Sequence, residues 1–253
     1  MLKAWAVLAL LIPACAAAGP LDAVESAGVL RVGTPGDYRP YALRAADGSY
    51  TGAEIELVRG FAERLGVHAE IVPTSWKTMA ADFAAGRFDL VVGGVSVTPE
   101  RAQQGDFSVT LNEDGKRPVV RCADKDRYIT LDAIDRPDVR VVVNLGGTNE
   151  AFARARLASA PITVESDNVS VAERLLAGEE DVFVTDGAEV DLLALRNPGR
   201  LCAATVAAPF THLTKAWWLP KDDAFKSAVD AFLTAAKADG IWQAALDRSM
   251  HQP

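Results

Sequence analysis

The segment VRVVVNLGGTNEAFARARLA, Val139–Ala158, decides how this chain folds. It begins with a β-branched run typical of a buried strand, passes through two glycines and continues in a helical pattern. A strand–turn–helix unit of this kind builds a sheet covered by helices when it recurs along a chain. Here it recurs in two series, one that precedes this segment and one that begins with it.

The first series lies between residues 29 and 98. Its strand-like runs are VLRVGT (29–34), AEIVPT (69–74) and FDLVVGGVSVT (88–98), and its helix-like runs are AEIELVRGFAERLG (53–66) and SWKTMAADFAAG (75–86). The second series continues through ITVES (162–166), NVSVAERLLAGE (168–179), DVFVTD (181–186) and AEVDLLAL (188–195). An apolar run, KAWWLP (215–220), needs a partner strand, and two helical patterns over residues 223–250 close the chain.

The two series predict an α/β protein with two lobes, each a mostly parallel sheet flanked by helices. About 235 residues, beyond an export signal, suit two units of about half that length. We expect lobe 1 at residues 19–117 plus 207–253, and lobe 2 at residues 118–206. Ligands of open α/β sheets bind at the carboxyl ends of the strands. Two facing units therefore predict a ligand-binding cleft between them.

Residues 1–18 predict a cleaved export signal. MLKAWAVLALLIPACAAA has Lys3, an apolar stretch up to Pro13 and a small-residue exit at residues 16–18. It is too short for a permanent membrane-spanning helix, so we expect a periplasmic protein without membrane insertion. A lipid anchor on Cys15 is the less favoured alternative, because Pro13 lies close to the small-residue site.

Charge and histidine content exclude two function classes. The formal net charge is −8, and it becomes −9 once Lys3, the only charged residue of the signal, is removed. An acidic chain without Lys/Arg runs is a poor nucleic-acid binder, because phosphate neutralisation supplies most non-specific affinity. The three histidines have no metal-ligand spacing, so no metal site is predicted.

Two cysteines, Cys122 and Cys202, remain after cleavage of the signal. In an oxidising compartment we expect them to form one disulfide, although two buried thiols are the alternative. The bridge would close a loop of about 80 residues, worth roughly 4 to 5 kcal/mol in the chain-entropy model.

Polar side chains, and glycines with free backbone N–H groups, follow the predicted strands. In the first unit they are Asp37, Tyr38, Thr74, Ser75, Trp76, Ser96, Thr98 and Arg101, and in the second Gly146, Gly147, Thr148, Asn149 and Asp186. GGTNE can seat an anion at a helix start, or Thr148 can simply cap that helix. Arg101 can grip a carboxylate through two hydrogen bonds, or it can be a solvated surface arginine.

Four residues allow two interpretations each. Asp186 and Glu189 fit a D-x-x-E capping box, which the spacing alone favours over a role in chemistry. Lys116, where the first unit passes into the second, either faces the cleft or is solvated. Trp76 either stacks on a flat ligand or packs at a helix start.

Together these motifs resemble a known family. Over nearly its whole mature length the chain is similar to the periplasmic amino-acid-binding proteins of ABC importers. The motifs that carry this similarity are GVLRVGTPGDYRPY, GRFDLVVGGVSVTPERAQQGDFS, GGTNE and VTDGAE. The resemblance implies two lobes that close on a ligand. Arg101 would hold its α-carboxylate, aided by Ser96 and the GGT backbone, and Asp186 would hold its α-amino group. The expected ligand-binding residues also include Thr98, Gly147, Thr148 and Asn149.

The similarity is closer to an enzymatic branch, the periplasmic cyclohexadienyl dehydratases, which convert prephenate to phenylpyruvate and arogenate to phenylalanine. The motifs that carry this closer similarity are PGDY, VPTSW, DGKRP, VNLGGTNEAFAR and the TD–E spacing. It implies that Glu189 is the general acid, with Asp37, Trp76 and Lys116 also in the active site. Binding proteins usually have Gln at the position of Lys116. Two departures are FSVTL (107–111) and Ala172, where the branch has aromatic residues.

The expected function is therefore decarboxylating dehydration of prephenate or arogenate without a cofactor. Glu189 should have a raised pKa in a closed cleft, and Lys116 should stay far enough away not to lower it. Trp76 would pack on the substrate ring, and Asp37 would orient polar groups. The alternative is a non-catalytic amino-acid-binding protein whose partner is a membrane permease. The sequence leaves open whether the protein forms a homo-oligomer.

Overall fold

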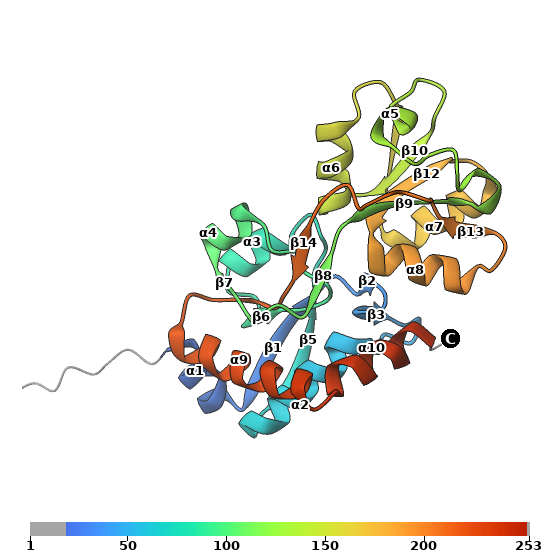
Figure 1. Cartoon of the computed structure of the whole chain (residues 1–253). Coiled ribbons are helices and arrows are strands. Elements are labelled where there is room, and N and C mark those ends of the chain that lie inside the picture. Colours follow the sequence, from blue (N-terminus) through green and yellow to red (C-terminus); the bar gives the residue numbers. More distant parts are fainter. Residues whose placement is uncertain (1–18, 252–253) are drawn as a thin grey trace, which may run out of the picture.

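A computed structural model describes residues 19–251. The export signal predicted for residues 1–18, with Cys15, lies outside the described residues. Figure 1 shows two lobes joined by extended segments, with the first part of the chain and its last two helices in the same lobe. The two-lobed α/β architecture predicted from the sequence is confirmed.

The first lobe is built on a mixed sheet with strand order β5-β1-β6-β15-β7. Its strands are β1 (Val29–Thr34), β5 (His68–Pro73), β6 (Leu90–Val91), β7 (Asp106–Phe107) and β15 (Trp218–Leu219). β1 runs parallel to β5 and β6, whereas β15 runs antiparallel to β6 and β7. Trp218 pairs with both Val91 and Phe107, so the apolar run near the C-terminus finds its partners in the first lobe.

Helices cover this sheet. They are α1 (Pro20–Ala27), α2 (Ala53–Leu65), α3 (Met79–Ala84), α4 (Pro99–Gln104), α9 (Asp223–Ala238) and α10 (Ile241–His251). In α2 the predicted apolar face is buried, with Ile55 and Phe61 at most 1% exposed, and Gly66 ends the helix at a φ of 73°. None of the described helices is long and apolar enough to cross a membrane.

The second lobe repeats the plan with strand order β11-β10-β12-β9-β13. Its strands are β9 (Lys116–Arg121), β10 (Val141–Asn144), β11 (Ile162–Glu165), β12 (Val182–Asp186) and β13 (Leu201–Ala203). Its helices are α5 (Leu131–Ile134), α6 (Thr148–Arg156), α7 (Asn168–Ala177) and α8 (Gly187–Arg196), with a 3-10 turn at Cys122–Asp124. β10 is parallel to β11 and β12, while β9 is antiparallel to β12 and β13. Both sheets are therefore mixed.

Two short antiparallel sheets border the cleft. β8 (Asn112–Asp114) pairs with β14 (Leu213–Lys215), and β2 (Asp37–Tyr38), β3 (Ala42–Arg44) and β4 (Tyr50–Thr51) form the other. β8 leads directly into β9, and β13 leads back towards β14. The chain thus crosses between the lobes along two adjacent segments, which places the ends of β9 and β14 at the cleft.

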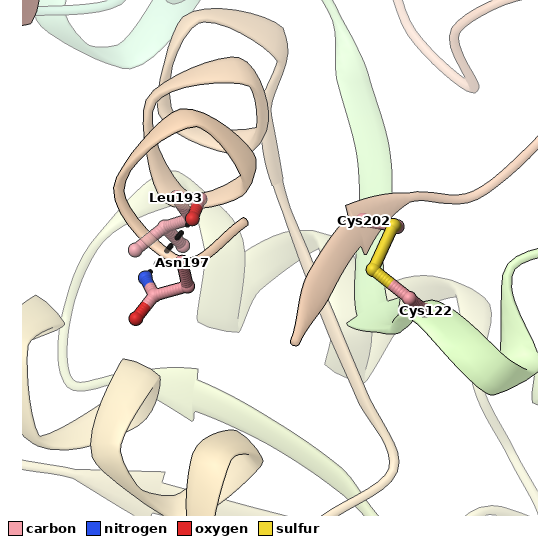
Figure 2. Close-up of a disulfide and its surroundings, with 4 residues drawn as sticks. All are labelled: Cys122, Leu193, Asn197 and Cys202. Atoms are coloured by element: carbon pink, nitrogen blue, oxygen red, sulfur yellow. Dashed lines mark hydrogen bonds between the residues drawn. A yellow bond between two sulfur atoms is a disulfide. The ribbon is translucent and has the colours of Figure 1, made fainter. Parts of the chain in front are cut away.

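The predicted disulfide is confirmed. Cys122, directly after β9, is bonded to Cys202 in β13, with a Cα–Cα distance of 4.8 Å (Figure 2). The bond joins neighbouring strands at one edge of the second sheet, across a sequence separation of 80 residues.

Candidate active site

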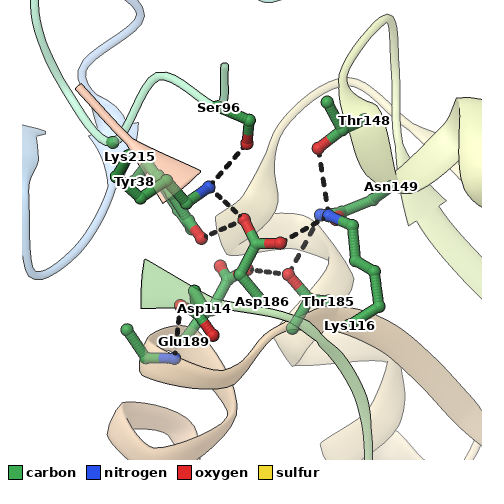
Figure 3. A network of polar contacts seen from close by, with 12 residues as sticks. Tyr38, Ser96, Asp114, Lys116, Thr148, Asn149, Thr185, Asp186, Glu189 and Lys215 are labelled. Carbon is green, nitrogen blue, oxygen red and sulfur yellow. Dashed lines mark hydrogen bonds and ion pairs between the residues drawn. The ribbon is translucent and has the colours of Figure 1, made fainter. Parts of the chain in front are cut away.

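Three buried charged side chains meet where the lobes face each other (Figure 3). Asp186 ends β12, Lys116 begins β9 directly opposite it in the sheet register, and Lys215 ends β14. Asp186 is 3% exposed and each lysine is 1% exposed. We call these three residues the lysine–aspartate cluster.

The Asp186 carboxylate binds both lysines. Oδ1 lies 2.7 Å from Lys116 Nζ, and Oδ2 accepts a hydrogen bond from Lys215 Nζ. Tyr38 also donates its hydroxyl to Oδ2, at 2.7 Å. Burial alone would raise the pKa of Asp186, but the two ammonium groups hold it well below its usual range. Asp186 is therefore ionised at neutral pH.

Lys215 is not among the site residues predicted from the sequence. Its ammonium group donates to Ser96 Oγ at 2.8 Å and lies 5.2 Å from the centre of the Tyr38 ring. The only sequence signal was a charge at the start of an apolar run, KAWWLP. Buried lysines need a paired anion, and the anion here belongs to the other lobe.

Lys116 connects the cluster to the start of α6. Burial lowers its pKa, although Asp186 acts in the opposite direction. Its ammonium donates to Thr148 Oγ1 at 3.0 Å and to the Asn149 side-chain oxygen. The residue preceding α6 is Gly147, with no side-chain cap, so the interpretation of Thr148 as its N-cap is wrong. The Thr148 hydroxyl is instead engaged by Lys116.

Glu189 lies in the first turn of α8 and is 5% exposed. A chain of hydrogen bonds reaches it, because Asn149 Nδ2 donates to Thr185 Oγ1 at 3.0 Å and Thr185 donates to Glu189 Oε2. Burial raises the pKa of Glu189 to about 8 against the lowering effect of the Thr185 hydroxyl. The negative charge of Asp186 raises the pKa of Glu189 further. The positive charge of Lys116 lowers it, and this effect is the smallest. Glu189 is thus mostly protonated at neutral pH.

The capping box predicted for Asp186 and Glu189 is wrong. Asp186 occupies the N-cap position of α8 but accepts no hydrogen bond from the helix. Asp114 of β8 takes this role and accepts from the N–H groups of Gly187 at 2.6 Å and Ala188 at 3.1 Å. Because a carboxylate from the crossing strand caps the helix, Asp186 and Glu189 are left for other partners.

Asp37 and Trp76 are joined at one side of the cleft. Trp76 Nε1 donates to Asp37 Oδ1 at 2.8 Å, and the backbone N–H of Asn168 in α7 donates to Oδ2 at 3.3 Å. Burial raises the pKa of Asp37, and the hydrogen bonds from Asn168 and Trp76 partly oppose this. Asp37 therefore links the first lobe to the second.

Arg101 and Thr98 lie next to Ser96 without reaching Asp186. Thr98 caps α4 and accepts from the Arg101 backbone N–H at 3.3 Å. The Arg101 guanidinium donates to the Ser96 carbonyl at 2.8 Å, and burial lowers its pKa to about 10. Arg101 is thus a part-buried cation at the edge of the cleft.

An inner cavity of about 20 Å³ remains at the centre. It is lined by Tyr38, Trp76, Gly94, Ser96, Asn144, Gly147, Thr148, Asn149, Asn168, Asp186 and Lys215. Gly94 is required there, because its φ is 75° and a Cβ would lie 2.6 Å from Tyr38. Glu54 supports this turn by accepting the N–H groups of Gly93 and Gly94. The space holds about one water, so a larger ligand enters only when the lobes or lysines move.

The site combines cations with one neutral acid. Lys116, Lys215 and Arg101 are positive, Asp186 is negative, and Glu189 is protonated, so positive charge is in excess. Such an arrangement can hold a dianion and donate one proton to it. Among the described residues no group of His, Cys, Asp and Glu side chains could hold a metal ion.

Comparison with known sequences identifies relatives of two kinds. Residues 30–252 match the bacterial extracellular solute-binding proteins, family 3. A cyclohexadienyl dehydratase from Pseudomonas aeruginosa is 42% identical, over 95% of this chain and 90% of that protein. The L-cystine-binding protein TcyJ from Escherichia coli is 30% identical, over 89% of this chain and 84% of that protein.

Solved structures fall into the same two kinds. The ancestral amino-acid-binding protein AncCDT-1, a precursor of cyclohexadienyl dehydratase, superposes with a TM-score of 0.83 at 30% identity and covers 92% of this chain and 100% of its own. A variant of the ancestral cyclohexadienyl dehydratase AncCDT-3 has a TM-score of 0.58 at 43% identity, with 94% and 98% covered.

Proposed function

This chain belongs to the bacterial extracellular solute-binding proteins, family 3, and we propose that within this family it is a cyclohexadienyl dehydratase. The proposed reaction is conversion of prephenate to phenylpyruvate, and of arogenate to phenylalanine. One observation distinguishes this function from ligand binding alone: Glu189 is a buried acid that stays protonated near neutral pH, beside several cations.

The proposed chemistry needs one proton and a held dianion. Glu189 transfers its proton to the ring hydroxyl of prephenate, which leaves as water. The bond between the ring and its carboxylate breaks, CO2 departs, and the electron pair of that bond completes the aromatic ring. A general acid works best when its pKa lies near the working pH, as that of Glu189 does. Solvent then returns a proton to the Glu189 carboxylate.

We assign the substrate carboxylates to the cations of the cleft. Lys116 and Lys215 are positioned to exchange the Asp186 carboxylate for one from the substrate, and Arg101 supplies a further guanidinium. Trp76 and Asp37, hydrogen-bonded to each other, form the side wall. The hydrogen-bond chain from Asn149 through Thr185 orients the acid.

Amino-acid binding without catalysis is the alternative, supported by the similarity to TcyJ and AncCDT-1. In that function Asp186 would accept the ammonium group of the ligand. Here the Asp186 carboxylate already forms ion pairs with Lys116 and Lys215 and accepts the Tyr38 hydroxyl. An added ammonium would meet two like charges, which disfavours a free amino acid and, of the two proposed substrates, favours prephenate over arogenate, which carries an ammonium group.

Turnover of prephenate tests the proposal. Purified protein is mixed with prephenate, and phenylpyruvate is followed by its absorbance. Wild type should turn over, while Glu189→Gln, which keeps the size and the hydrogen-bond acceptor, should lose about 100-fold or more in kcat. Absent turnover by wild type, together with stoichiometric binding of an amino acid, would establish the transport alternative. Equal turnover by Glu189→Gln would mean that another group donates the proton.

We also propose that the mature protein works in the periplasm. Family 3 consists of extracellular proteins, and a disulfide joins Cys122 to Cys202. Disulfides persist in oxidising compartments. Fractionation of producing cells tests this placement, with the protein expected in the periplasmic fraction and shortened by the residues of the signal.

A further inference from the structure

A second cavity, of about 180 Å³, is lined by Glu189, which does not line the inner cavity. We call it the outer cavity. Its apolar wall comes from β3 and from the facing sides of α7 and α8, with Leu43, Ala172, Leu176, Leu192 and Leu193. Val169 also lines it and is 51% exposed, so the apolar surface continues to the outside. Asp37 and Glu189, which the proposed dehydration uses, lie at its edge, but none of the cations assigned to the substrate carboxylates lines it.

The outer cavity also has a cation without a bonded anion. Arg39, between β2 and β3, lines it, and the buried Nη1 of Arg39 has no hydrogen-bond partner among residues 19–251. Burial lowers the pKa of Arg39, and the nearby charge of Arg196 lowers it further. A buried guanidinium nitrogen in this state gains from a carboxylate partner.

The acids that line the outer cavity form no ion pair with Arg39 among the described residues. The Asp37 carboxylate accepts hydrogen bonds from Trp76 and Asn168. Glu173 is exposed to solvent, which screens its charge, and Glu189 is protonated. Arg39 and Arg196 both line the cavity, so it combines an apolar wall with a cationic side that can hold a negative group.

We propose that the outer cavity binds a small aromatic carboxylate, with the ring against the leucines and the carboxylate on Arg39. The volume fits this class, because an apolar cavity of about 150 Å³ is known to bind benzene. Arg39 comes from the first lobe, while most of the apolar wall comes from α7 and α8 of the second. The bound ligand would thus contact both lobes and the side of Glu189 away from the inner cavity.

Calorimetric titration with phenylacetate tests this site. Wild type should bind phenylacetate. Arg39→Gln should weaken binding about tenfold or more, because it removes a charge-assisted hydrogen bond. Ala172→Phe, at a half-buried position of α7, should fill the cavity and abolish binding while the protein stays folded.

Two controls make the test specific. Arg64→Gln, an exposed arginine of α2, should bind phenylacetate like wild type. Phenylacetamide, which lacks the charge, should bind wild type and Arg39→Gln equally. No binding by wild type, or equal binding of phenylacetate by wild type, Arg39→Gln and Ala172→Phe, would overturn the proposal. Because the readout is binding and not turnover, either result leaves the test of the dehydratase function independent.

Discussion

Replacing Glu189 by Gln should change how stability depends on pH. The pKa of Glu189 rises from 4.5 to about 8 in the folded protein, mainly through burial. Each pKa unit corresponds to about 1.4 kcal/mol, so the full change is worth about 5 kcal/mol. Between about pH 4.5 and about pH 8 the unfolded chain has released this proton while the folded protein still holds it. The free energy of unfolding therefore falls as pH rises through this range.

Glu189→Gln lacks this proton and should not show the fall. Gln keeps an oxygen that can accept the Thr185 hydroxyl, so the two proteins should have similar stability near about pH 4.5. Above about pH 8 the variant should be more stable by about 5 kcal/mol. Urea unfolding followed by tryptophan fluorescence, at several pH values between these limits, measures the difference.

The comparison requires a control that removes a carboxyl without the burial. Glu63→Gln, on the exposed side of α2, should keep the pH dependence of wild type. A constant difference between wild type and Glu189→Gln over the whole range would refute the reasoning, since it would mean that Glu189 ionises alike in the folded and unfolded states.

Other changes test the lysine–aspartate cluster and the disulfide. Asp186→Asn should open the empty protein, because two ammonium groups left without a counter-ion cost about 3 to 5 kcal/mol, and small-angle scattering should show a larger radius of gyration. Lys215→Met should raise KM for prephenate about tenfold or more in steady-state assays, since a charged contact to a carboxylate is lost. Replacing both Cys122 and Cys202 by Ser should lower the free energy of unfolding by about 4 to 5 kcal/mol, measured by urea denaturation.

Exposed residues provide the controls. Asp132→Asn should leave the radius of gyration unchanged, and Lys221→Met should leave KM unchanged. If Asp186→Asn scatters like wild type, Asp186 does not hold the lobes together. If Lys215→Met retains its KM, the substrate carboxylates bind elsewhere, and undiminished stability of the double Ser variant would show that the disulfide is not stabilising.

The fold could be predicted because its signals are local. The β-branched runs of β10 and β12 and the apolar face of α2 each fit one period of secondary structure. The direction of β9 and β15 could not be predicted, because hydrophobic pattern does not distinguish parallel from antiparallel neighbours. Both are antiparallel members of otherwise parallel groups, so the sheets are mixed.

The position after a strand predicted part of the site, and the family resemblance predicted Lys116 and Glu189. Asp186 and Ser96 could be found from their position, whereas Lys215 could not, because its partner Ser96 lies 119 residues away. The prediction of a capping box was wrong for the same reason. Asp114, 73 residues before Gly187, takes the helix N–H group that the local pattern assigned to Asp186. Long-range partners of this kind leave no local signal in the sequence.

The Asp186 carboxylate has a consequence for affinity and turnover. Because it pairs with Lys215 of the other lobe, it holds the two lobes together around an inner cavity that fits about one water. A ligand must compete with this internal carboxylate for the lysines. Its apparent affinity is therefore its intrinsic affinity multiplied by the fraction of molecules in which the lysines are accessible. For a protein that captures a scarce solute, this lower apparent affinity is a disadvantage. For the proposed enzyme, the same carboxylate is available to replace the departing product carboxylate on Lys116 and Lys215.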